Sequence, residues 1–294
     1  AAVTHVHVRG LDMTQQLRTG VARLAALALA FVLAGFFPLK AHAGSITGFV
    51  FEDVNYGGGA GRDLLTSGGL TQPGARVELY NGTTGFFMNG TTTDSLGHYK
   101  FNGVGAGIYI VRVVTSTVSS SRVGYNPGIH FATSTYHVNS GTGTPVPVTN
   151  EVGGHVPAQP DGAAAGSGAR IDVNTFQFLV GPTGYAQTAS PVLGPPAGTV
   201  TDIDFGLNFD VIVNTNVFGA GSLTTFLMNA NGMSNTGLAQ QGFAPDTEHA
   251  IWMISNGTSA PGLRSTLNYF TAGVAQIQPD GALPTVTDPV ILDA

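Results

Sequence analysis

The sequence has no cysteine and few charged residues. The absence of cysteine excludes a thiol nucleophile, a disulfide framework, iron–sulfur clusters and thiolate zinc sites. Charged residues make up 10% of the chain, well under the usual quarter. There are 11 Lys and Arg against 17 Asp and Glu, so no basic patch is available for a phosphate backbone. We therefore exclude nucleic acid as a partner.

Apolar and turn-forming residues are abundant instead. Hydrophobic residues make up 43% of the 294 residues, which separates the chain from disordered proteins. Glycine occurs 42 times and proline 16 times. Low charge combined with many Gly, Thr, Val and Asn residues is typical of an all-β extracellular protein, and it excludes a coiled coil and most helical bundles. The length allows two domains with sizeable cores.

Residues 13–43 have the three parts of a secretory signal peptide. Arg18 and Arg23 form its positively charged start, and residues 24–37 form an apolar run. Residues 41–43, Ala-His-Ala, then supply the small side chains that a signal peptidase reads. The apolar run is shorter than the roughly 20 residues that a membrane-spanning helix needs, which favours a cleaved signal over an anchor.

We expect cleavage before Gly44 and a secreted, extracellular product associated with the cell surface. Residues 1–12 precede Met13, and we interpret them as translated upstream sequence. No other run is long and apolar enough to span a bilayer, so the mature chain is expected to contain no transmembrane segment.

Short stretches of alternating β-forming residues run through residues 46–114. Gly-rich and Asn-Gly turns separate them at a spacing of about ten residues, which favours an antiparallel β-sandwich. Alternation also predicts which side chains share a face of a strand. The predicted sets are Val77 with Leu79, Tyr99 with Phe101, and Ile108 with Ile110 and Arg112, while Val111 and Val113 face the other way.

Residues 115–198 are rich in Ser, Gly, Pro, Thr and Ala and contain few apolar pairs. Strand-like patterns occur there only at 129–138, 145–148 and 174–180. We interpret this segment as a long loop-rich insert that contributes loosely to the domain. Alternation returns at 200–214, which we predict to be the strand that closes the domain.

After residue 214 the apolar spacing becomes helical. Leu223, Phe226, Leu227 and Ala230 stand at i, i+3, i+4 and i+7, and Ser222 is the expected N-cap. Apolar strands are predicted to follow at 250–255, 273–278 and 289–294. One amphipathic helix followed by short apolar strands favours the N-terminal cap of a β-solenoid.

Four motifs occur in a fixed order within residues 46–114: G-x-V-F-x-D-x-N, V-x-L-Y, T-D-x-x-G-x-Y-x-F and G-x-Y-x-V-x-V. In this order they resemble the B-type repeat domain of serine–aspartate-repeat surface proteins and collagen adhesins. Residues 202–209, DIDFGLNF, resemble the closing strand of the same family, and residues 213–231 resemble the entry segment of bacterial surface proteins with a right-handed parallel β-helix.

The resemblance implies an all-β architecture. Residues 44–212 would form a prealbumin-like antiparallel β-sandwich that carries the loop-rich insert. Residues 213–294 would form the N-terminal cap and first strands of a parallel β-helix, and we interpret Ala294 as a fragment boundary.

The first loop holds the candidate metal ligands Asp53, Asn55 and Asp63. Calcium takes six to eight oxygen ligands, which a flexible loop with such side chains can supply. In the resembled family this loop binds calcium, typically through D-x-N-x-D-G, whereas here Gly57 stands at the third ligand position. Calcium is therefore one hypothesis, and an Asx-rich turn that closes a hairpin is the other. No other cofactor is expected.

Other constellations point away from catalysis. Some members of the resembled family form a lysine–asparagine isopeptide bond, but the first strand here has no lysine. His130 and His137 have no carboxylate at ligand spacing. Asp202 and Asp204 would share a strand face as a glycosidase pair might, yet we expect them to have no aromatic subsite neighbours. No serine has a nucleophile-elbow context, and we expect no enzymatic activity.

These observations favour a secreted bacterial cell-surface structural or adhesion protein with the sandwich as stalk or spacer. Its partners would be a host or matrix protein or a surface polysaccharide. One alternative is a carbohydrate-binding module, for which Phe86, Phe87 and Tyr125 are the candidate stacking aromatics. Another is a polysaccharide-degrading β-helix enzyme whose active groove lies beyond Ala294.

Overall fold

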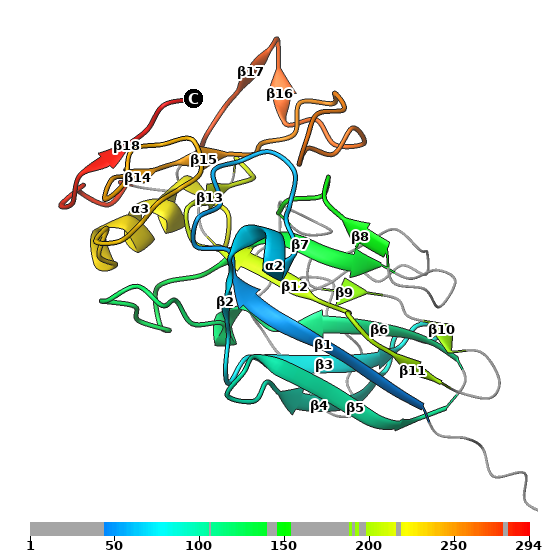
Figure 1. Ribbon diagram of the computed structural model, residues 1–294. Coiled ribbons are helices and arrows are strands. Elements are labelled where there is room, and N and C mark those ends of the chain that lie inside the picture. The colour runs from blue at the N-terminus through cyan, green and yellow to red at the C-terminus, as the bar shows by residue number, and fades with distance from the viewer. Residues whose placement is uncertain are drawn as a thin grey trace, which may run out of the picture. The chain divides into compact units, whose positions relative to one another are not determined.

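The computed structural model describes most of the chain after the predicted signal peptide (Figure 1). None of the helices in this part of the chain is long and apolar enough to cross a membrane. The predicted signal peptide, 13–43, and the predicted strand 174–180 lie outside the described residues. The described residues are 44–105, 107–139, 146–153, 188–189, 192–193, 198–215, 219–278 and 282–294.

Seven strands form the largest sheet: β1 (Gly44–Glu52), β2 (Leu70–Thr71), β5 (His98–Val104), β7 (Thr133–Asn139), β8 (Val146–Val148), β11 (Thr199–Val200) and β12 (Phe205–Asn208). Strand β1 pairs antiparallel with β5 and β2, and parallel with β11 and β12. Strand β7 then pairs with β12, and β8 pairs with β7. The sheet is therefore assembled around the first strand of the described chain.

Five strands form a second sheet: β3 (Arg76–Asn81), β4 (Phe87–Thr92), β6 (Gly107–Val113), β9 (Thr188–Ala189) and β10 (Val192–Leu193). Strand β3 lies between β4 and β6 and is antiparallel to both. Strands β9 and β10 pair with β6. The strands predicted between residues 46 and 114 are thus divided between two sheets.

Side chains from both sheets enter one apolar core, which stabilises the fold by roughly 25 cal/mol per Å² of buried apolar surface. The predicted sharing of strand faces is confirmed, because alternation turns every second side chain toward the same side of a strand. Arg112 lies on the opposite face of β6, where it is also buried. The side chains of β3, β5 and β6 that enter the core include Val77, Leu79, Tyr99, Phe101, Val111 and Val113.

The segment that we expected to contribute loosely is integral to the core as far as Val138. Val118 and Ala132 are fully buried, and Tyr136 and Val138 from β7 pack in the same cluster. Between these apolar residues β7 carries small hydroxyl side chains, and Ser134 is also fully buried. The backbone ladder to β12 satisfies the polar main chain of β7, so a strand that is Ser- and Thr-rich can be buried.

The closing segment pairs with the first strand, as its sequence predicts. In this parallel pair Val50 is opposite Phe205 and Glu52 is opposite Leu207. The strand is shorter than predicted because Asp202 has a φ of 63°, which interrupts the extended backbone before β12. A further break follows where the Asn208 side chain accepts a hydrogen bond from the backbone N–H of Asp210 at 2.7 Å.

The helix predicted near residue 222 is confirmed as α3 (Leu223–Gly232). The Ser222 hydroxyl accepts a hydrogen bond from the Thr225 backbone N–H at 3.1 Å, which caps the first turn. The predicted apolar face packs against Ile212, Ala250 and Ile254 in a second core cluster. That face consists of Leu223, Phe226, Leu227 and Ala230.

Short strands surround this helix. Strand β13 (Val211–Ile212) pairs parallel with β15 (Ile251–Trp252), and β14 (Glu248–His249) pairs parallel with β18 (Val290–Ile291). Strands β16 (Phe270–Thr271) and β17 (Val274–Ala275) form an antiparallel pair. Besides α3, the described helices are the short α2 (Leu64–Ser67) and a 3-10 turn, η1 (Thr115–Thr117). The predicted all-β class is confirmed.

Candidate functional site

The first loop places Asp53 beside an arginine. Asp53 directly follows β1, and its side chain is fully buried. Its Oδ1 atom lies 2.5 Å from Nη2 of Arg62, which also donates from Nη1 to Gln241 Oε1 at 2.9 Å. Burial raises the pKa of Asp53 to about 6, while Arg62 acts in the opposite direction. The guanidinium thus supplies the positive charge that this carboxylate needs.

The other two calcium candidates have separate roles in the structure. Asp63 is the N-cap of α2 and accepts hydrogen bonds from the backbone N–H and the hydroxyl of Thr66, both at 2.8 Å. The backbone carbonyl of Asn55 accepts a hydrogen bond from the Gln241 N–H at 2.9 Å. Among the described residues no group of three or more His, Asp or Glu is placed to hold a metal ion. Calcium at Asp53, Asn55 and Asp63 therefore stays a hypothesis, for which Asp53 and Asp63 would have to exchange their present partners.

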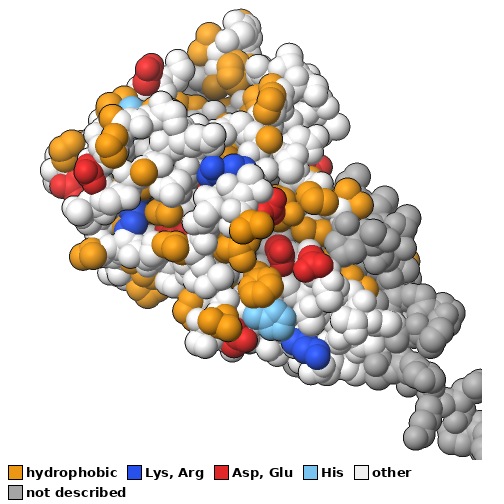
Figure 2. All heavy atoms as spheres, in the orientation of Figure 1, with side chains coloured by type: hydrophobic (Ala, Val, Ile, Leu, Met, Phe, Trp, Pro, Cys, Tyr) orange, Lys and Arg blue, Asp and Glu red, His pale blue; other side chains and the backbone are white. Residues whose placement is uncertain are grey.

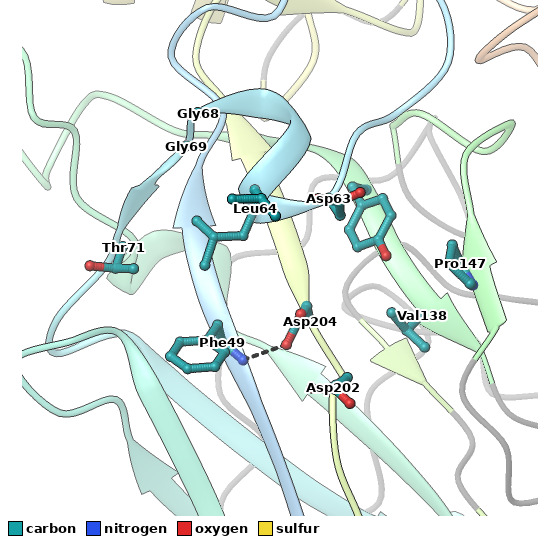
Figure 3. Close-up of a pocket in the computed structure, with 12 residues that line it drawn as sticks. Phe49, Asp63, Leu64, Gly68, Gly69, Thr71, Val138, Pro147, Asp202 and Asp204 are labelled. Carbon is teal, nitrogen blue, oxygen red and sulfur yellow. Dashed lines mark hydrogen bonds between the residues drawn. The ribbon is translucent and has the colours of Figure 1, made fainter.

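A cavity of about 860 Å³ lies between α2 and the largest sheet, where it is lined by residues of β1, β7 and β8 and by the segment before β12. Its apolar wall includes Phe49, Leu64 and Val138, which come from three different elements (Figure 3). On the face drawn in Figure 2, acidic side chains lie among hydrophobic ones. The carboxylates that line the cavity are Asp63, Asp202 and Asp204.

Asp204 is the most enclosed of the three carboxylates. Its Oδ1 atom accepts a hydrogen bond from the Phe49 backbone N–H at 2.8 Å, which ties it to the middle of β1 (Figure 3). Burial above all, with a smaller contribution from the carboxylates of Asp202 and Asp63, raises the pKa of Asp204 to about 6, while the hydrogen bond from the Phe49 N–H lowers it. Asp204 therefore exchanges its proton in mildly acidic solution.

Asp202 and Asp204 face the same cavity, as their i, i+2 spacing predicts. The residue between them, Ile203, is fully buried in the core on the other side. Asp202 Oδ2 accepts a hydrogen bond from the Thr201 hydroxyl at 2.7 Å. The expectation that no aromatic residue is near this pair is wrong, because the fold brings Phe49 and Tyr136 into the same lining.

Tyr136 shows how strongly the acidic groups act on the cavity. Burial raises its pKa, and Asp204, Asp63 and Asp202 contribute in the same direction.

Neither a protein-family model nor a curated protein matches the sequence. The function of the cavity has to be argued from its own chemistry, which is that of an apolar pocket with a negative wall.

The histidines and the candidate stacking aromatics lie elsewhere. His130 Nδ1 accepts a hydrogen bond from the Asn126 backbone N–H at 2.9 Å, and the buried His137 lies 3.7 Å from a Glu151 carboxylate oxygen. Phe87 packs edge-on against Tyr80, and Tyr125 packs edge-on against Phe209. Phe86 is 48% exposed. These placements favour structural roles for the two histidines, Phe87 and Tyr125.

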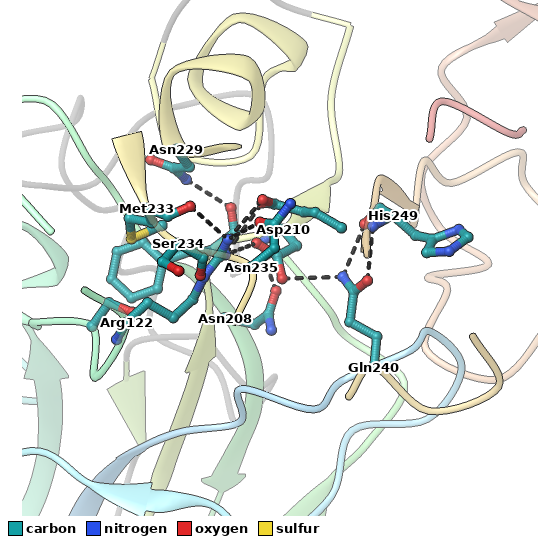
Figure 4. Close-up of polar contacts among 12 residues, drawn as sticks. Arg122, Asn208, Asp210, Asn229, Met233, Ser234, Asn235, Gln240 and His249 are labelled. Atoms are coloured by element: carbon teal, nitrogen blue, oxygen red, sulfur yellow. Dashed lines mark hydrogen bonds and ion pairs between the residues drawn. The ribbon is translucent and has the colours of Figure 1, made fainter. Parts of the chain in front are cut away.

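Sequence reasoning missed a buried arginine, Arg122, that binds two distant carboxylates (Figure 4). Arg122 donates from Nη1 to Asp210 at 2.8 Å and from Nη2 to Glu248 at 2.6 Å. Its Nε also donates to the Ser234 carbonyl at 3.1 Å. Gln240 donates to the second oxygen of Asp210 at 3.0 Å. Nothing in the serine-rich sequence around Arg122 signals this role, because its partners Asp210, Ser234 and Glu248 lie 88, 112 and 126 positions away.

Proposed function

We propose that the chain belongs to a secreted bacterial cell-surface protein without enzymatic activity, in which residues 44–212 act as a stalk or spacer module. A β-helix that begins after residue 212 would carry the adhesive body and contact a host or matrix protein or a surface polysaccharide. The observation that carries the proposal is the parallel pairing of β1 with β12. The ordered surface-protein motifs at residues 46–114 support it.

The mechanical consequence follows from strand direction. When two parallel strands are neighbours, a pull on the N-terminal end of one and the C-terminal end of the other loads all their hydrogen bonds together. Strand β1 is also held along its other edge by β5 and β2. Because the chain has no cysteine, these ladders and the core have to bear a load without disulfides. Such an arrangement suits a module that separates a surface from an adhesive body.

The finer architecture is part of the same proposal. The two large sheets would form a prealbumin-like sandwich of the B type, and the sharing of one core by both sheets supports this. The pairs β13–β15 and β14–β18 would be the first rungs of a parallel β-helix, with α3 as its cap. Their parallel direction supports it, since a solenoid stacks each strand parallel to the one before.

Export is tested on the protein from its own cells. We expect N-terminal sequencing of the extracellular or surface-bound material to begin at Gly44. Protease added to intact cells should degrade this protein while a cytoplasmic marker stays intact. Material that begins at Met13, or that resists external protease until the cells are lysed, would contradict the proposal.

The spacer role is tested by single-molecule pulling. Because the natural chain has no cysteine, one cysteine introduced at Ser45 and one at Thr215 give two unique attachment points. A pull between these two points shears β1 against β12. The matched control attaches at Arg76 and Thr92, which are opposite each other in β3 and β4, so that the strands unzip one bond at a time. We expect the first geometry to resist a force several times higher than the second. Equal forces would contradict a load-bearing role.

A further inference from the structure

The cavity between α2 and the largest sheet is lined by negative side chains that no positive side chain of its described lining neutralises. Three aspartates line it, and among the other described residues of its lining there is no Lys, Arg or His. Arg62, which precedes Asp63 in the chain, is engaged by Asp53 and Gln241. Negative groups held at a partly buried apolar surface raise one another's energy unless a cation lies nearby. A positively charged occupant would therefore be favoured.

A small metal ion does not match this arrangement. Metal ions need several oxygen ligands that converge on one point, and the described residues contain no such group of three or more His, Asp or Glu. The carboxylates are instead distributed around a space of about 860 Å³ whose other walls are largely apolar. A space of this size accommodates an organic group, and its apolar wall favours one with an aliphatic body.

The carboxylates also discriminate between types of organic cation. One oxygen of Asp204 is engaged by the Phe49 N–H, and one oxygen of Asp202 by the Thr201 hydroxyl. Both oxygens of Asp63 already accept hydrogen bonds from Thr66. None of the three therefore offers the pair of free oxygens that a guanidinium binds with its two parallel N–H groups. A compact ammonium group, which takes single oxygens from different directions, fits better.

We propose that this cavity binds the side chain of a lysine presented by a partner protein. The ammonium group would lie among Asp202, Asp204 and Asp63, and the aliphatic stem would pack against Phe49 and Leu64. The aromatic rings in the lining add a favourable face for a cation. The inference does not depend on the spacer role, because an apolar, negatively charged pocket would select this group on a protein of any function.

The test titrates the full chain with small probes and follows backbone amide shifts by NMR. The probes are lysine blocked at both backbone ends, the same compound acetylated on its ε-nitrogen, and blocked arginine. We expect saturable shifts at Phe49 and Asp204 with blocked lysine, at least tenfold weaker binding of the neutral acetylated probe, and weaker binding of blocked arginine. Equal binding of the charged and acetylated probes, or no saturable shift, would overturn the proposal.

Variants locate the site. The double variant Asp202→Asn/Asp204→Asn keeps the size of both side chains, and asparagine tolerates the left-handed backbone at position 202. We expect it to weaken blocked-lysine binding at least tenfold. Asp94→Asn, at an exposed turn outside the cavity, is the matched control and should change binding less than twofold. Unchanged binding in the double variant, with its amide spectrum otherwise native, would overturn the proposed site.

A last arm distinguishes a protein side chain from a free amine. Pentylamine has the same single ammonium and aliphatic stem but lacks the peptide groups of blocked lysine. We expect blocked lysine to bind at least as tightly as pentylamine, because a side chain presented by a partner enters with its backbone at the mouth of the cavity. Clearly tighter binding of pentylamine would overturn the assignment to a partner protein. None of these binding results bears on whether the protein reaches the cell surface, which the export experiment tests separately.

Discussion

Two carboxylates, Asp210 and Glu248, share one buried cation, Arg122. Burial and the neighbouring Glu248 raise the pKa of Asp210, and Arg122 acts in the opposite direction. Arg122 itself is 8% exposed and donates to both carboxylates and to the Ser234 carbonyl. Buried ion pairs of this kind are costly to break, because removal of one partner leaves the others charged and desolvated.

Arg122→Ala is therefore expected to lower the free energy of unfolding by about 3–5 kcal/mol, measured by urea denaturation at pH 7. Lys100→Ala, at an exposed position of β5, is the control and should change it by less than about 0.5 kcal/mol. The triple variant Arg122→Met/Asp210→Asn/Glu248→Gln should recover most of the loss, since no unpaired charge remains. A loss of less than about 1 kcal/mol in Arg122→Ala would contradict the role assigned to this arginine.

Asp204 makes the stability of the protein depend on pH. Its pKa is about 6 in the folded protein against an ordinary value of 3.8, so the folded state holds its proton more tightly than the unfolded state. The stability that this proton contributes is fully present below pH 3.8 and is lost as the pH rises through 6. Asp204→Asn retains the acceptor for the Phe49 N–H and removes this titration.

We expect Asp204→Asn to be more stable than the natural protein at pH 8, by on the order of 1 kcal/mol. The difference should shrink as the pH falls to 4, where the natural carboxyl is also neutral. Urea midpoints at pH 4, 6 and 8 measure it. Asp53 has a similarly raised pKa but is present in both proteins, so it cancels from the comparison. A variant that is less stable at pH 8 would show that the negative charge supports the fold.

Helix α3 illustrates how one element is specified by its own sequence. Its cap and its buried face follow the spacing of residues 222–230. By contrast, β7 could not be recognised as a core strand from composition, because Ser and Thr separate its apolar side chains. A polar strand becomes buried only when neighbours satisfy its backbone, and here the neighbours are β12, about 70 residues later, and β8.

The cap of α3 gives a test at this scale. Ser222→Ala removes the acceptor for the Thr225 N–H and should lower the free energy of unfolding by about 1 kcal/mol. Ser222→Gly should lower it by only a few tenths, since glycine is itself accepted at this position. Thr224→Ala, in the first turn but outside the cap, is the control. The same small loss in all three variants would show that the hydroxyl does not stabilise the helix.

At the scale of the whole molecule, the first strand of residues 44–212 lies beside a strand near the end of that range, because β1 pairs with β12. The composition of residues 116–198 predicts that limited proteolysis nicks first within this segment. Because β12 pairs with β1 and with β7, we expect the nicked halves to remain associated on gel filtration until denaturant is added. Cuts within β7 should be absent from the earliest products, since its side chains are buried. Halves that separate without denaturant would contradict this pairing.

Local periodicity alone determined much of the fold. The repeat of two or about 3.6 residues predicts which side chains share a face of β3, β5 and β6 and which form the apolar face of α3, because backbone geometry sets the direction of successive side chains. The same reasoning placed Asp202 and Asp204 on one face. The all-β class followed from composition, since many β-branched residues and glycines with few charges suit strands and turns.

Only the tertiary structure decided which distant residues meet. It placed Arg62 beside Asp53, which the loop sequence does not signal, and it brought Phe49 and Tyr136 to the aspartates of the cavity. It also paired Arg122 with carboxylates 88 and 126 positions away. Sequence patterns report on neighbours within a few residues, whereas the environment of a charge depends on chain segments that meet only when the core forms.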